Sequence, residues 1–170
     1  TLPASPDLEV FNADNNLLTG PIPVAISSRT KLRTIFLNNN QLSGAIPSDI
    51  GNLSQLEVLS LGVNQLSGSI PQSIGSCTKL YALGLAENML TGQIPESLSN
   101  LVELQELYFS ANQLTGPIPS GIGNLTKLHE LWLNNNQLSG DIPAGIGALV
   151  NAERIYLSAN RLTGTIPVGL

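Results

Sequence analysis

The sequence has very little of the chemistry that catalytic and metal sites require. Its 170 residues include one cysteine and one histidine. The lone Cys77 permits no internal disulfide, and we expect a buried small hydrophobe because it takes a core leucine position. The lone His129 argues against a catalytic triad and against a multi-histidine metal site. No G-x-x-x-x-G-K loop is present either, so we expect no enzyme activity, no metal and no cofactor.

Charged residues are also scarce, at 11% of the chain, and acidic residues outnumber basic ones by 12 to 7. Phosphate contacts need a basic face, so the net charge of -5 predicts no nucleic-acid partner. No apolar run approaches the length of a membrane span, and we expect no membrane segment within this sequence. No signal peptide is visible, so we expect any such segment to have been removed or to lie outside this chain.

What the sequence does have is an internal repeat of 24 residues, which runs seven times without insertion or deletion. The pattern is L-x-x-L-x-L-x-x-N-x-L-x-G-x-I-P-x-x-I-G-x-L, and the units start at Leu8, Leu32, Leu56, Leu80, Leu104, Leu128 and Ala152. A fixed period of this length predicts a solenoid, in which each unit buries its apolar edge only against its neighbours. No linker or composition shift interrupts the period, so we predict one continuous array over residues 1–170.

Each unit predicts a short strand followed by turns. The alternation in L-x-x-L-x-L is typical of a strand with one buried face, and stacked copies would pair in parallel. The glycine of L-x-G suits a positive φ, and the proline that follows disfavours helix, so we predict short second strands and 3₁₀ turns. One asparagine recurs in every unit, and a polar side chain inside a solenoid must be hydrogen-bonded. We predict a structural ladder of Asn16, Asn40, Asn64, Asn88, Asn112, Asn136 and Asn160.

These residues resemble the plant-specific class of leucine-rich repeats, whose hallmark is L-x-G-x-I-P in a 24-residue unit. The resemblance implies an α/β-type solenoid, a curved right-handed superhelix with a parallel concave β-sheet, short second strands, 3₁₀ turns and little α-helix. It also implies a non-catalytic module of a secreted or cell-surface receptor or inhibitor, as in receptor kinase ectodomains, receptor-like proteins and polygalacturonase inhibitors. The expected partners are a protein or peptide ligand, a co-receptor or a cell-wall polysaccharide enzyme, met outside the cell or at its surface.

Members of this class usually have cysteine-containing caps at both ends of the array, and this sequence has none. The terminal units of a solenoid need polar covers. We therefore expect the chain to be a segment of a longer protein or to be covered by a partner.

Strand residues that point away from the core would line the concave sheet, and one such column is rich in aromatics. It contains four of the seven aromatic residues of the chain, three of them in consecutive units. Tyrosine and tryptophan dominate binding hot spots, which predicts a partner-binding patch, although aromatics also favour strands for packing alone. With neighbouring charges included, the predicted binding residues are Phe36, Tyr81, Glu106, Tyr108, Glu130, Trp132, Arg154 and Tyr156.

Three other interpretations of the sequence stay open. Glu106 and Glu130 suggest a hydrolytic carboxylate pair, but an open sheet excludes no water. Two glycosylation sequons begin at Asn52 and Asn124, although G-N-L-[ST] is also a common form of this repeat. The alternative to a receptor module is an ice-binding solenoid, because hydroxyl side chains form an unbroken column at Thr19, Ser43, Ser67, Thr91, Thr115, Ser139 and Thr163.

Overall fold

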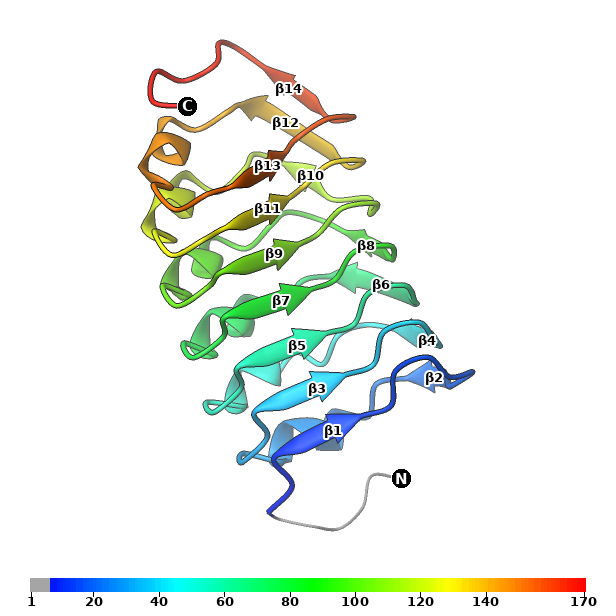
Figure 1. Cartoon of the computed structure of the whole chain (residues 1–170). Helices are drawn as coiled ribbons and strands as arrows, with labels where there is room; N and C mark the ends of the chain where they lie inside the picture. The colour runs from blue at the N-terminus through cyan, green and yellow to red at the C-terminus, as the bar shows by residue number, and fades with distance from the viewer. Residues whose placement is uncertain (1–6) are drawn as a thin grey trace.

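The structure, a computed structural model, describes residues 7–170 as a stack of similar coils with one long parallel sheet (Figure 1). The sheet has seven strands in the order β1-β3-β5-β7-β9-β11-β13. Each strand contributes three residues, and neighbouring strands pair at an offset of one 24-residue unit, as Val10 pairs with Thr34. The strands are Val10–Asn12, Thr34–Phe36, Val58–Ser60, Ala82–Gly84, Glu106–Tyr108, Glu130–Trp132 and Arg154–Tyr156. This confirms the predicted parallel sheet.

Alternation along these strands places the core on one side of the sheet. The middle residue of each strand packs inward, and Leu59, Leu83, Leu107 and Leu131 are almost completely buried. The residues on either side of it point outward and form the concave surface. Phe109 and Cys77 are fully buried in the same core. Burial raises the pKa of the Cys77 thiol to about 11, as expected for an unreactive core cysteine.

Short second strands form two further parallel sheets behind the first, in the orders β2-β4-β6-β8 and β10-β12-β14. The glycines of the L-x-G segments lie here and have φ of 73° to 81°, as predicted. An isolated bridge between Gln93 and Thr115 links the two sheets, and the Thr115 N–H donates to the Gly92 carbonyl at 2.8 Å. The strands are Thr19–Pro21, Gln41–Gly44, Gln65–Ser69, Met89–Thr91, Thr115–Gly116, Gln137–Asp141 and Arg161–Thr163.

The second strands pair at a different offset from the concave strands. Thr19 lies opposite Gln41 and Ser43 lies opposite Gln65, so neighbours are 22 residues apart instead of 24. Each hydroxyl therefore lies beside the residue that begins the next second strand. The repeat pattern contains no sign of this stagger.

Six 3₁₀ helices complete the coils, and the described residues contain no α-helix. They span Val24–Ser28, Ile50–Asn52, Gln72–Ser76, Glu96–Asn100, Ser120–Asn124 and Ala144–Ala148 (η1 to η6). A proline precedes most of them and its carbonyl accepts the first turn's N–H, as Pro71 accepts from Ile74 at 3.0 Å. Within residues 7–170, no helix is long and apolar enough to cross a membrane.

The recurring asparagines bond backbone groups of two adjacent coils. The Asn88 amide nitrogen donates to the carbonyls of Leu61 and Leu85 at 3.1 Å, and to Ala86 at 3.3 Å. Its amide oxygen accepts the Leu66 N–H at 2.9 Å. The equivalent asparagines Asn40, Asn64, Asn112, Asn136 and Asn160 form the same kinds of bond. Asn16 is exposed and donates only within its own coil.

One residue in every unit adopts the left-handed backbone conformation without being glycine. Their φ values are 52° to 56°, and in all but Ala159 the N–H bonds the next coil, as Val63 donates to the Ala86 carbonyl at 2.9 Å. Asparagine tolerates this conformation, whereas a β-branched valine is strained in it. The residues are Asn15, Asn39, Val63, Glu87, Ala111, Asn135 and Ala159.

Replacing Val63 with asparagine is expected to stabilise the protein by about 1 kcal/mol, because it relieves left-handed strain at a half-exposed side chain. The unfolding midpoint should rise by about 2–4 °C. Val150 is a matched control, since it is also exposed but does not have a positive φ. An equal rise in Val150→Asn, or no rise in Val63→Asn, would show that strain at residue 63 is not the cause.

Candidate ligand-binding face

Three aromatic side chains meet on the concave surface of consecutive strands β9, β11 and β13. The sheet register places Tyr108 opposite Trp132 and Trp132 opposite Tyr156. The Tyr108 and Trp132 rings have centroids 5.4 Å apart at 87°, and Trp132 and Tyr156 are 4.9 Å apart at 70°. The rings therefore pack edge to face. Edge-to-face pairs are favourable and fix ring orientation. We call Tyr108, Trp132 and Tyr156 the aromatic strip.

The charges beside the aromatic strip are largely committed to internal contacts. The indole N–H of Trp132 donates to Oε2 of Glu130 at 2.8 Å, and Arg154 forms an ion pair with Oε1 of the same carboxylate. The Trp132 hydrogen bond, followed by the Arg154 contact, lowers the pKa of Glu130. Burial, together with Glu106 and Glu130, raises the pKa of Tyr108. Glu130 therefore orients Trp132. Glu106, the other predicted carboxylate, is exposed and forms no ion pair among residues 7–170.

A shallow trough of about 300 Å³ adjoins the aromatic strip along the sheet. Small residues of the neighbouring strands and loops line its floor, namely Ser60, Gly62, Gly84 and Ala86. Tyr108 and Trp132 form part of its lining on the side of the strip. The central trough could not be predicted from the sequence, because serine, glycine and alanine carry no signal of binding by themselves. It can take one side chain of a bound segment against an aromatic wall.

The other two predicted aromatic residues do not join the strip. Phe36 lies on β3, and Ser60 and Gly84 occupy the two strands between it and Tyr108. Tyr81 precedes β7, is exposed, and lies in the column of Arg33 and Glu57 near the beginning of the strands. The eight predicted binding residues thus divide into a compact group on β9, β11 and β13 and two separate aromatics.

The two sequons lie away from the aromatic strip. Asn52 ends η2 and Asn124 ends η5, and both residues are exposed. Their glycosylation stays a prediction. No group of three or more histidine, cysteine, aspartate or glutamate side chains within residues 7–170 could hold a metal ion.

Comparison with known proteins identifies the repeat. A family model described as Leucine Rich Repeat matches residues 31–53, 55–77 and 79–101. A model for two copies of the repeat matches residues 102–151. Comparison with curated proteins gave no match.

Solved structures extend the comparison to the whole fold. A TDR receptor has a TM-score of 0.93 and 36% identity over 95% of this chain. The Arabidopsis receptor kinase HAESA ectodomain, bound to an IDA peptide hormone, has a TM-score of 0.85 and 41% identity over 91% of this chain. A plant ice-binding protein has a TM-score of 0.67 and 28% identity. The match covers 96% of this chain and 68% of the ice-binding protein.

The shared region is a small part of the receptors. The chain spans 28% of the TDR receptor and 26% of HAESA. Four observations indicate the same family: the repeat length, the L-x-G-x-I-P segments, the coils they form and these matches. The chain belongs to the leucine-rich repeat family, in its plant-specific class.

Proposed function

We propose that this chain is a non-catalytic recognition module that binds a peptide or protein segment across its concave sheet, outside the cell. The observation that carries the proposal is the aromatic strip beside the central trough. Trp132 is oriented by Glu130 and by both tyrosines before any partner arrives. Rigid aromatic side chains supply contact area at a low cost in conformational entropy.

The relatives support a peptide or protein partner and an extracellular setting. HAESA is a receptor kinase ectodomain whose structure holds a peptide hormone. The fold of this chain matches that of HAESA with a TM-score of 0.85, and no helix covers the concave surface of this chain (Figure 1). Catalysis fits the site poorly, because Glu130 already accepts from Trp132 and Arg154 and is not free to act as a base.

Selection of peptides from a random display library tests the proposal without a known ligand. Peptides selected against the wild-type chain should bind Trp132→Ala much more weakly. Met89→Ala is the matched control, since Met89 is an exposed apolar side chain on β8, in a different sheet. Selected peptides that bind Trp132→Ala and the wild type equally would contradict the proposal. A purified co-receptor or cell-wall polysaccharide enzyme can take the place of the selected peptide in the same comparison of the wild type with Trp132→Ala.

Ice binding is the second candidate, because a plant ice-binding protein shares the fold and hydroxyl residues recur in every unit. The 22-residue offset of the second strands disfavours it. Thr115 pairs with Gln137 and Ser67 with Met89, so the column hydroxyls of successive units lie diagonally and not directly opposite one another.

We therefore expect no thermal hysteresis from this protein, because the column hydroxyls of successive units do not lie directly opposite one another. The measurement is the gap between melting and freezing points of a single ice crystal in a protein solution. Thr115→Leu serves as the comparison, since Thr115 lies in the hydroxyl column. A gap in the wild type that Thr115→Leu abolishes would favour ice binding over the receptor proposal.

A further inference from the structure

A second hollow lies at the edge where the concave strands begin, in the first four coils. Its volume is about 370 Å³, and it is lined by Glu9, Lys31, Arg33, Gln55, Glu57 and Lys79. All six are charged or amide side chains, and they come from the segments just before β1, β3, β5 and β7 or the turns that lead into them. We call it the charged hollow. The aromatic strip is in the later coils, so the two sites do not overlap.

The charged hollow gathers three cations in a chain that is negative overall. Three of its residues are cations and two are carboxylates, whereas the chain carries 7 basic and 12 acidic residues. Two of its cations form ion pairs, Arg33 with Glu57 and Lys31 with Asp7. Lys79 and Glu9 are then the charged residues of the hollow that form no ion pair among residues 7–170.

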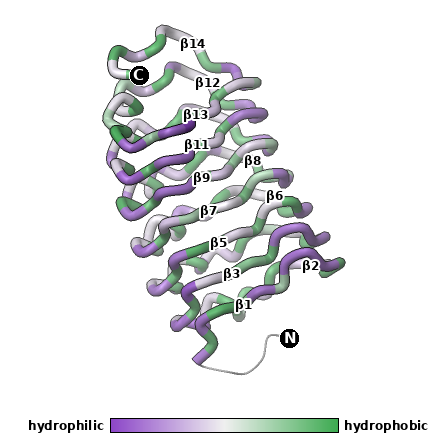
Figure 2. The backbone as a smooth tube through the Cα atoms, viewed as in Figure 1, coloured by the Kyte–Doolittle hydropathy of each residue, from purple (hydrophilic) through white to green (hydrophobic). Residues whose placement is uncertain are grey.

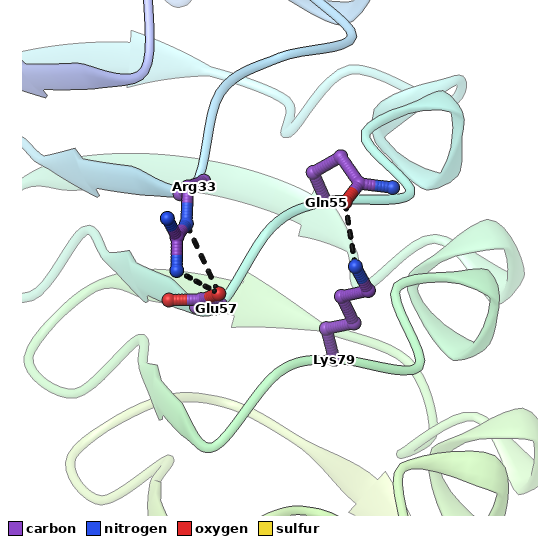
Figure 3. Close-up of polar contacts among 4 residues, drawn as sticks. All are labelled: Arg33, Gln55, Glu57 and Lys79. Atoms are coloured by element: carbon purple, nitrogen blue, oxygen red, sulfur yellow. Dashed lines mark hydrogen bonds and ion pairs between the residues drawn. The ribbon is translucent and has the colours of Figure 1, made fainter.

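Lys79 contacts a neutral group where equivalent lysines contact acids. Its ammonium donates to the Gln55 amide oxygen at 2.6 Å (Figure 3). Lys31 and Lys127 occupy the same position in other units, and they pair with Asp7 and with Glu103. Among residues 7–170 Lys79 has no ion pair. An amide oxygen holds the ammonium in place without neutralising it, and the other two N–H groups stay free.

Arg33 presents further unused donors in the same hollow. Its Nε and Nη2 both donate to the single oxygen Oε1 of Glu57, at 3.1 Å and 2.7 Å (Figure 3). A guanidinium has five N–H donors, so three are available to a second acceptor. The Arg33 side chain is half exposed, so those donors are within reach of a ligand.

We propose that the charged hollow binds a carboxylate of the ligand, supplied by an acidic side chain, through Lys79 and the free donors of Arg33. Charge-assisted hydrogen bonds from lysine and arginine to carboxylates are among the strongest polar contacts in proteins. Glu9 and Glu57 disfavour a polyphosphate or nucleic acid, because a second or third negative charge would face them.

This inference rests on the proposed function, because it takes the concave side as the ligand surface. It adds the direction in which the bound segment runs along the coils. An acidic residue of the segment would lie over the early coils, and its apolar residues would lie over the central trough and the aromatic strip. The strand starts of β9, β11 and β13 are strongly hydrophilic and include the exposed Glu106 (Figure 2). The exposed Glu106 carboxylate therefore disfavours an acidic residue over these late strands, whereas the Lys79 ammonium, which has no ion pair among residues 7–170, favours it over the early coils.

A peptide probe tests the charged hollow directly. Acetyl-hexaglutamate amide, titrated at low ionic strength into ¹⁵N-labelled protein, should shift the amide signals around residues 31–33, 55–57 and 79–81. The affinity should fall about tenfold in Lys79→Gln, as the loss of one charge-assisted bond predicts. A second peptide, acetyl-hexaglutamine with a free terminal carboxylate, distinguishes a chain terminus from acidic side chains as the source. We expect the hexaglutamate peptide to bind more tightly.

Lys127→Gln is the matched control, because Lys127 lies at the same position two units later and is already paired with Glu103. It should leave hexaglutamate binding unchanged. Equal loss in Lys79→Gln and Lys127→Gln, or signal shifts spread over the whole surface, would overturn the proposal in favour of non-specific attraction. Tighter binding of the hexaglutamine peptide would overturn the assignment to an acidic side chain. Trp132→Ala should not affect this titration, so failure here is distinguishable from failure of the aromatic-strip proposal.

Discussion

Replacement of Asn88 with alanine is expected to destabilise the protein by about 1–3 kcal/mol, the cost of buried groups left without partners. The side chain is buried, and it bonds three carbonyls and the Leu66 N–H in two adjacent coils. Alanine has no polar side-chain atom and fills none of these roles. Because each coil of a solenoid contacts only its neighbours, the loss falls at one interface in the middle of the stack.

The measurement is the free energy of unfolding from denaturant titration, together with a fall of about 2–12 °C in the thermal midpoint. Asn16→Ala is the control, because Asn16 is exposed and its two donated bonds stay within its own coil. That variant should change stability by much less. A stability of Asn88→Ala equal to that of the wild type would show that the asparagine ladder is not a structural requirement.

Removal of the Trp132 side chain is expected to weaken ligand binding by about 2 kcal/mol or more, a factor of roughly 30. Trp132 contacts Tyr108 on one side and Tyr156 on the other, and it lines the central trough. Its loss would remove the wall of the trough and leave both tyrosines without an edge-to-face partner. The binding constant of a display-selected peptide, measured by calorimetry, gives the size of the effect.

The fold should survive this substitution. Trp132 points away from the core, and its neighbour Leu131 carries the inward contacts. Trp132→Phe separates the contribution of apolar contact area from that of the hydrogen bond to Glu130, because phenylalanine keeps much of the apolar area but cannot donate to Glu130. We expect intermediate binding from that variant. If Trp132→Ala proves unfolded, the phenylalanine variant still tests the strip.

Much of the fold could be predicted because its determinants are local and repeat. Alternation in L-x-x-L-x-L specifies which face of a strand is buried, and the period specifies which strands become neighbours. The left-handed glycines followed from the same reasoning, because only glycine adopts that conformation freely. The buried position of Cys77 followed from its place in the leucine pattern.

Other features depend on relations that no single unit contains. The left-handed positions after the strands hold asparagine, valine, glutamate or alanine, so residue type does not mark them. The 22-residue stagger of the second strands results from coil geometry. The bond from Trp132 to Glu130 depends on rotamers, and the charged hollow combines residues from two different columns. For the candidate site, sequence predicted the aromatic column but not the trough beside it.

The most direct test of the concave aromatic strip as the binding surface is iodide quenching of tryptophan fluorescence. Trp132 is the one tryptophan among 170 residues, so the signal reports this position alone. Saturation with a display-selected peptide should protect Trp132 from iodide and shift its emission to shorter wavelength, because the ligand covers the indole. Unchanged quenching and emission at saturation would mean that the ligand binds elsewhere, and would contradict the account.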